Sequence, residues 1–178
     1  EAVLPRLRTD PVTVETEVEG EAVAVGVGAF EVQWLAANLL GGDSRRVSDR
    51  ILTYGLFIDP PLGRVRMTEA QARAEGRTVH VCRFPWAASG RAMTLDRPAG
   101  VTKLVVDPES EQILGVGIVG SGAGELIAEG VVAIEMGATV SDLRLCIHPH
   151  PTLSETLMES AEVFFGQSTH VHRTKRGR

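Results

Sequence analysis

Residues 115–130 read GVGIVGSGAGELIAEG, an apolar run that ends in glycines and continues into an amphipathic segment. Three of the glycines match the pattern G-x-G-x-x-G, which often marks a turn that holds a dinucleotide's pyrophosphate at a helix N-terminus. The junction between the expected strand and the expected helix lies at 120–125, however, and its last position is Glu125 rather than glycine. Because a carboxylate repels a pyrophosphate, we expect the glycines of 120–124 to let the helix pack close to the sheet instead.

The segments on either side predict an antiparallel sheet. Two apolar runs, at 101–106 and 113–119, enclose the turn sequence DPESE, and this arrangement is typical of a hairpin. A hairpin strand has the wrong topology for a dinucleotide site, which follows a buried parallel strand. Further strands are expected at 52–58 and 78–84, and helices at 69–76 after a capping box at Thr68, at 121–137, and along the apolar stripe 153–164.

These elements predict an α+β fold in which an antiparallel sheet is covered by helices, spanning residues 51–166. Residues 1–50 are expected to form an N-terminal appendage, with a hairpin and a short helix, and residues 167–178 a basic tail. The chain has 178 residues, of which 43% are hydrophobic, and this is enough for one domain with a core.

Composition excludes several classes of function. The net charge of −5 argues against general nucleic-acid binding, and no apolar run reaches the roughly 20 residues that a membrane-spanning helix needs. Cys82 and Cys146 both lie in apolar contexts, so two buried thiols in a reducing, cytoplasmic compartment are expected. The first methionine is Met67, and we therefore expect the chain to be a fragment, a processed product or an engineered piece.

The stretch IHPHPTLSE at 147–155 is the strongest candidate for chemistry. Prolines flank His150 on both sides and favour a rigid, extended loop that presents the imidazole. Glu155 falls in the first turn of the next helix, where its carboxylate can meet that imidazole and make it a general acid–base. Glu155 also fits a capping box with Thr152, so a purely local role for this carboxylate stays open.

The histidines also allow a metal site. His148 and His150 form one H-x-H pair, and His170 and His172 form another. Four imidazoles suit zinc or copper if the two pairs converge, but nothing in the sequence shows that they do. A histidine-rich metal-binding protein is therefore kept as an alternative, with no metal ligand assigned.

With the motif at 147–155 in place, the sequence resembles the C-terminal interface, or dimerisation, domain of the pyridine nucleotide-disulfide oxidoreductases. It is most similar to the dihydrolipoamide dehydrogenase group, whose motif is H-x-H-P-T-x-x-E. Three further stretches follow the family's order: FIDPPLGRVRMTEAQA at 57–72, FPWAASGRA at 84–92, and ILGVGIVGSGAGELIAEGVVAIEMGAT at 113–139. The resemblance covers about residues 51–166.

The resemblance implies a mechanism and a dimer. In such enzymes FAD and NAD bind in two preceding domains, and a redox disulfide beside the flavin exchanges with a substrate dithiol. The resemblance makes His150 the base that takes a proton from the dithiol and makes Glu155 the residue that orients it. It also implies a homodimer in which this pair reaches across a twofold interface into the partner's active site.

The sequence also departs from the family. The redox cysteine pair and the flavin-binding fingerprint are missing, and Val27 stands where the family has an aspartate that contacts the flavin. We therefore expect this chain to hold no FAD or NAD, to be inactive alone, and to need the missing domains or a catalytic partner chain. The alternative is a stand-alone assembly or binding module that keeps the fold without catalysis. The substrate stays open, and lipoamide-like dithiols fit best.

Overall fold

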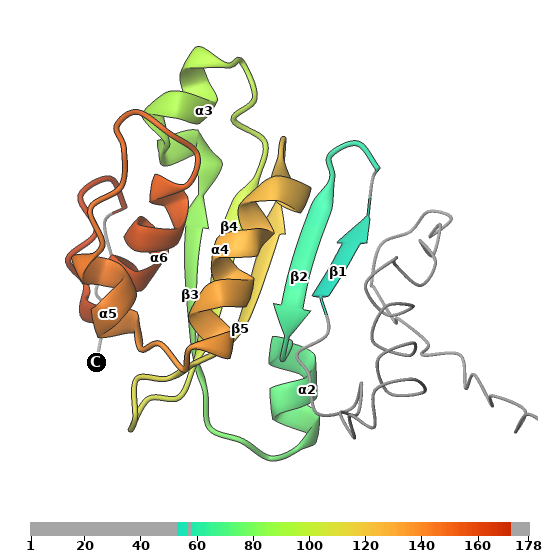
Figure 1. Cartoon of the computed structure of the whole chain (residues 1–178), viewed down its shortest axis with the longest axis vertical. Helices are drawn as coiled ribbons and strands as arrows, with labels where there is room; N and C mark the ends of the chain where they lie inside the picture. Colours follow the sequence, from blue (N-terminus) through green and yellow to red (C-terminus); the bar gives the residue numbers. More distant parts are fainter. Residues whose placement is uncertain (1–52, 57, 172–178) are drawn as a thin grey trace, which may run out of the picture.

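The computed structural model describes residues 53–56 and 58–171. Within this part of the chain five strands form one sheet in the order β1-β2-β5-β4-β3, and every neighbouring pair is antiparallel. Helices α4, α5 and α6 lie in front of the sheet in Figure 1, and α2 lies at one end. The elements are β1 (Thr53–Leu56), β2 (Leu62–Arg66), α2 (Glu69–Ala74), β3 (His80–Pro85), the 3-10 turn η2 (Trp86–Ala88), α3 (Gly90–Thr94), β4 (Val101–Val106), β5 (Ile113–Val119), α4 (Ala123–Glu135), α5 (Val140–Leu145) and α6 (Glu155–Phe165).

The predicted α+β class and the predicted hairpin are both confirmed. β4 and β5 pair antiparallel, with Leu104 opposite Val116, and β2 pairs with the other edge of β5. β5 is therefore the central strand of the sheet, and it is antiparallel to both of its neighbours. The helix that follows it belongs to a hairpin topology and not to a parallel strand–turn–helix unit.

One face of the sheet forms the core beneath α4 and α6. Strand residues alternate between the two faces, so Val65, Val116, Leu104 and Cys82 form one row across four strands. All four are almost completely buried. The helices add apolar side chains to this core, among them Ile127, Ile134, Leu157 and Ala161.

Two glycines set how closely α4 approaches the sheet. A Cβ at Gly63 would lie 2.6 Å from the carbonyl oxygen of Ala123, and one at Gly130 would lie 3.1 Å from Val116. The sequence assigned this role to the glycines of the strand–helix junction, and that detail was wrong. Gly120, in the junction, has φ of 142° and packs against Trp86 instead.

Several other elements differ from those that the sequence predicted. The expected helix 121–137 is two residues shorter at each end, and α5 was not predicted. β2 and α3 were not predicted as separate elements. Cys82 is buried as expected, but Cys146 is exposed because it follows the last turn of α5.

Some expectations concern residues outside the described part. The hairpin and short helix of the appendage, Val27 and His172 all belong there. None of the described helices combines the length and the apolar character that crossing a bilayer requires.

Candidate active site

His150 and Glu155 meet, as the sequence predicted. The Nδ1 atom of His150 lies 2.8 Å from Oε1 of Glu155. His150 stands in the loop between α5 and α6, and Glu155 is the first residue of α6. The start of a helix therefore fixes the carboxylate, and the proline-flanked loop brings the imidazole to it.

The second oxygen of Glu155 fixes the loop. Oε2 accepts a hydrogen bond of 2.6 Å from the backbone N–H of Thr152. The Thr152 hydroxyl donates to the carbonyl of Pro149, and Ser154 stands at the N-cap with no side-chain capping bond. Only half of the expected capping box at Thr152 is therefore present, and its glutamate also serves His150.

Hydrogen bonding keeps Glu155 ionised. Partial burial acts to raise its pKa, but the hydrogen bonds from Thr152 and His150 outweigh burial and hold the pKa below its ordinary value. A carboxylate at Nδ1 selects the imidazole tautomer with its proton on Nδ1, which leaves the Nε2 lone pair available. The His150 side chain is 74% exposed, so Nε2 is accessible to another molecule.

A buried polar network anchors the start of α6 behind this pair. The hydroxyls of Thr102 and Thr156 lie 2.7 Å apart, and the indole N–H of Trp86 donates to Thr102 over 3.0 Å. All three residues are buried, so the network holds Thr156, and with it the neighbouring Glu155, against the sheet. Sequence reasoning missed this network, because Thr102 and Thr156 are distant in sequence and neither matches a motif.

His148, the other histidine of the motif, holds the loop in place and does not face solvent. One ring nitrogen of His148 lies 3.0 Å from the carbonyl oxygen of Cys146, and the other lies 2.6 Å from Glu129 of α4. The His148 side chain is only 8% exposed. Both of its nitrogens are therefore occupied, and His148 ties the loop to α4 while His150 points outward.

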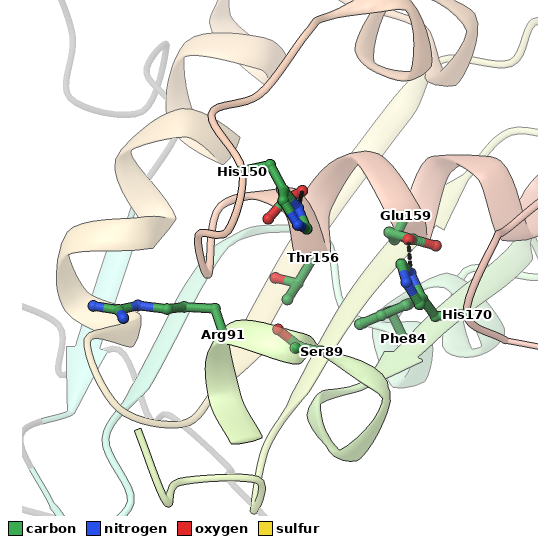
Figure 2. A pocket seen from close by; sticks show the side chains of 9 residues that line it. Phe84, Ser89, Arg91, His150, Thr156, Glu159 and His170 are labelled. Carbon is green, nitrogen blue, oxygen red and sulfur yellow. Dashed lines mark hydrogen bonds and ion pairs between the residues drawn. The ribbon is translucent and has the colours of Figure 1, made fainter. Parts of the chain in front are cut away.

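His150 also lines a small pocket of about 50 Å³, together with Glu155 and residues of three other segments. Figure 2 shows Ser89 and Arg91 on one side of His150, and a second histidine–glutamate pair, His170 and Glu159, on another. Glu159 is buried, and one of its carboxylate oxygens contacts Nδ1 of His170. The other accepts a hydrogen bond of 2.6 Å from the Ser168 hydroxyl. Ser168 and His170 belong to the stretch 167–178, which was expected to be a basic tail.

The described histidines do not converge on one metal centre. His148, His150 and His170 each contact a different glutamate. Among the described residues no three histidine, cysteine or acidic side chains are grouped so that they could hold a metal ion. His172 lies outside this part of the chain, so the second H-x-H pair is only half described.

Gly115 of the glycine-rich segment lies against the backbone of a neighbouring segment. A Cβ at Gly115 would lie 1.9 Å from the carbonyl oxygen of Met67, so backbone already fills that space. α4 begins after Gly122, and its first turn carries Glu125. Gly115 and Gly117 lie inside β5, so they do not form a turn between the strand and α4.

Solved structures with the same fold define the class of protein. The HOCl-induced flavoprotein disulfide reductase RclA from Escherichia coli, in its Cu(II) complex, matches with a TM-score of 0.69 and 32% identity. The match covers 75% of this chain and 31% of that one. LpdA from Mycobacterium tuberculosis shares the fold, with a TM-score of 0.69 and 21% identity. That match covers 76% of this chain and 29% of the LpdA chain. The fold is that of a domain of flavoprotein disulfide reductases.

The sequence gives the family. Residues 53–161 match the pyridine nucleotide-disulphide oxidoreductase dimerisation domain, and the chain belongs to this family. Dihydrolipoyl dehydrogenase from Thermus scotoductus is 53% identical over 116 residues, which are 65% of this chain and 25% of that protein. The enzyme of the same name from Vibrio cholerae is 38% identical over 159 residues. These residues are 89% of this chain and 33% of the Vibrio cholerae protein. The chain thus spans a quarter to a third of these relatives.

Proposed function

We propose that this chain is the part of a dihydrolipoamide dehydrogenase-like enzyme that supplies the acid–base pair for dithiol–disulfide exchange. His150 is the catalytic residue, and Glu155 orients it. The observation that carries the proposal is the 2.8 Å contact between an exposed imidazole and a carboxylate fixed at the start of a helix. The pair would act in the active site of the partner subunit of a homodimer.

The proposed step is a proton transfer followed by exchange. Nε2 of His150 accepts the proton of a substrate thiol, and the carboxylate of Glu155 stabilises the imidazolium that results. The thiolate attacks a disulfide, so that one new S–S bond forms while the old one breaks and its other sulfur leaves as a thiolate. His150 returns the proton in the reverse direction.

The remaining parts of the reaction belong elsewhere in a complete enzyme. Cys82 is buried and Cys146 is exposed, and the described residues contain no disulfide. FAD and NAD would bind in the domains that the relatives' greater length supplies. The substrate that fits the proposal is a lipoamide-like dithiol.

A face beside the site supports the homodimer. His148 joins its loop to Glu129 of α4, and exposed large apolar side chains lie within seven residues of these two in the sequence. Exposed apolar surface of this kind favours a protein–protein contact. We define the dimer face by the exposed residues Val132 (62%), Met136 (79%), Leu145 (72%) and Ile147 (99%).

A chimera tests the proposed role. Residues 51–171 replace the matching domain of the Thermus scotoductus dihydrolipoyl dehydrogenase, and NAD-dependent oxidation of dihydrolipoamide is measured. We expect the chimera to be active and His150→Ala to lower kcat by about 10²- to 10⁴-fold, the usual contribution of a general acid–base. The control is His170→Ala, which removes the other histidine from the same pocket and is expected to keep most of the activity. Full turnover by His150→Ala would refute the assignment.

The alternative, an assembly module without catalysis, rests on the same exposed dimer face. It predicts that the chain captures a partner through Val132 and Ile147 while His150 is dispensable. The chimera separates the two proposals, because an assembly module gives correctly assembled dimers whose turnover is low and unaffected by His150→Ala.

A further inference from the structure

The sheet face opposite α4 and α6 carries a row of cations. The strand registers place Tyr54, Arg64, Gly117, Lys103 and Arg83 side by side across all five strands of the described sheet. These residues alternate with those buried under the helices, so they belong to the opposite face. We call this set the cationic row.

The same face is apolar beside the cationic row and open at its centre. A Cβ at Gly117 would meet nothing nearer than Cε of Lys103 at 3.9 Å, so the middle of the row leaves room for a further group. Side chains of the adjacent row keep partial or full exposure, whereas those under the helices are almost completely buried. The adjacent row consists of Leu56, Leu62, Val119, Val101 and Pro85.

Charge on this face is only partly compensated. Glu69 of α2 pairs with Arg83 and Arg73, and it lies 3.9 Å from Nζ of Lys103. One carboxylate thus serves several cations. Burial lowers the pKa of Lys103 despite the opposing effect of Glu69, so this ammonium group is partly desolvated without full compensation.

Arg64 has no acidic partner among the described residues. Its guanidinium lies 4.7 Å from the centre of the Tyr54 ring, and its Nε is buried without a hydrogen-bond partner. A buried N–H that lacks an acceptor is costly, and carboxylates are the acceptors that a guanidinium prefers. An anion on this face would supply the missing acceptor.

The sequence supplies a matching anionic segment. Residues 9–44 contain seven acidic residues and no lysine or arginine, and four of the acids are Glu15, Glu17, Glu19 and Glu21. In this stretch the acids alternate with Thr16, Val18 and Gly20, which suits a face with one cationic and one apolar row. The segment also precedes β1, the edge strand of the sheet, in the same chain.

We propose that residues 12–21 of this chain dock on the cationic row, with their glutamates facing Arg64 and Lys103. Covalent tethering gives the segment a high effective concentration at this face, which favours it over an acidic segment of another molecule. The docking satisfies Arg64 and covers the apolar row. It does not depend on the catalytic role of His150.

Zero-length cross-linking tests the docking. A carbodiimide couples carboxylates only to amines in contact with them, and the chain has just two lysines, Lys103 and Lys175. The full chain is treated as a mixture of unlabelled and ¹⁵N-labelled protein, and linked peptides are identified by mass spectrometry. We expect Lys103 to be linked to a glutamate of 15–21 within one chain. Coupling to Glu69 serves as the internal positive control.

Matched variants sharpen the test. Arg64→Gln is expected to lower the yield of the link between Lys103 and residues 15–21 about fivefold. Salt of about 1 M is expected to have the same effect, because the electrostatic screening length falls to about 3 Å. Arg77→Gln removes an arginine that pairs with Glu75 away from the row, and it should leave the yield unchanged. Coupling of Lys103 to Glu69 alone, links that join two chains, or equal effects of the two variants would each overturn the proposal.

Discussion

The two oxygens of Glu155 have different partners, and Glu155→Gln separates them. A glutamine keeps one acceptor for the Thr152 N–H, but it cannot stabilise an imidazolium as a carboxylate does. In the active chimera we expect kcat to fall about tenfold, less than for His150→Ala. Unfolding in urea should show a loss of less than about 1 kcal/mol, as for other partly exposed pairs. A loss of activity as large as that of His150→Ala would contradict the positioning role.

Replacing Glu162 by glutamine is expected to stabilise the fold at neutral pH but not at acid pH. Burial, and then the neighbouring Glu159, raise the pKa of Glu162, and its Oε2 is buried without a hydrogen-bond partner. A raised carboxyl pKa favours the fold while the group is protonated, and this advantage is lost as pH rises through the folded-state pKa. Glu162→Gln should therefore raise Tm at pH 7 and change it little near pH 4. A variant with a lower Tm at pH 7 would contradict this reading.

The contact between α4 and the sheet is set by glycine, and Gly63→Ala tests it. The added Cβ would lie 2.6 Å from the carbonyl of Ala123 and 2.8 Å from Cβ of Ile127, so the helix must move away. We expect a loss of about 1–3 kcal/mol in the free energy of unfolding, which is typical of overpacking. Gly117→Ala is the control, because its Cβ would meet only Cε of Lys103, at 3.9 Å. Equal effects of the two substitutions in urea would contradict the account.

The elements that sequence predicted best are those with strong local signals. The β4–β5 hairpin has a turn sequence between two apolar runs, and Thr68 and Gln71 form both bonds of the expected capping box. β2 was missed because LGRVR is short and holds two arginines. α5 was missed because six residues are too few to show a helical period.

The candidate site was predictable only where its residues are near in sequence. His150 and Glu155 are five residues apart, and proline rigidity with helix geometry suffices to bring them together. The contacts of Thr156 with Thr102 and of His170 with Glu159 depend on how elements pack, which no local pattern encodes. The sequence predicted that glycines 120–124 allow the close approach of α4, whereas Gly63 and Gly130 do so. This could not be predicted, because one segment of sequence does not show which residues of other strands and helices it will face.

Self-association of the whole chain is expected through the dimer face. Val132 and Ile147 are 62% and 99% exposed, so a charge at either position is tolerated in a monomer but disrupts a dry interface. Sedimentation analysis of the purified chain should give a dimer, and Val132→Glu with Ile147→Glu should give a folded monomer. The double substitution Glu75→Gln and Glu109→Gln, at exposed positions outside this face, is the control. A wild-type chain that stays monomeric at high concentration would contradict the interface.

The central claim is that His150 acts in the partner's site, and mixing two inactive chimeras tests it most directly. One carries His150→Ala, and the other lacks a cysteine of the redox disulfide in the relative's portion. If the pair acts across the twofold axis, each hybrid dimer has one intact site, and an equal mixture after subunit exchange recovers about one quarter of the unmodified chimera's activity. If His150 serves its own subunit, no site is intact, and the mixture stays as inactive as its two components.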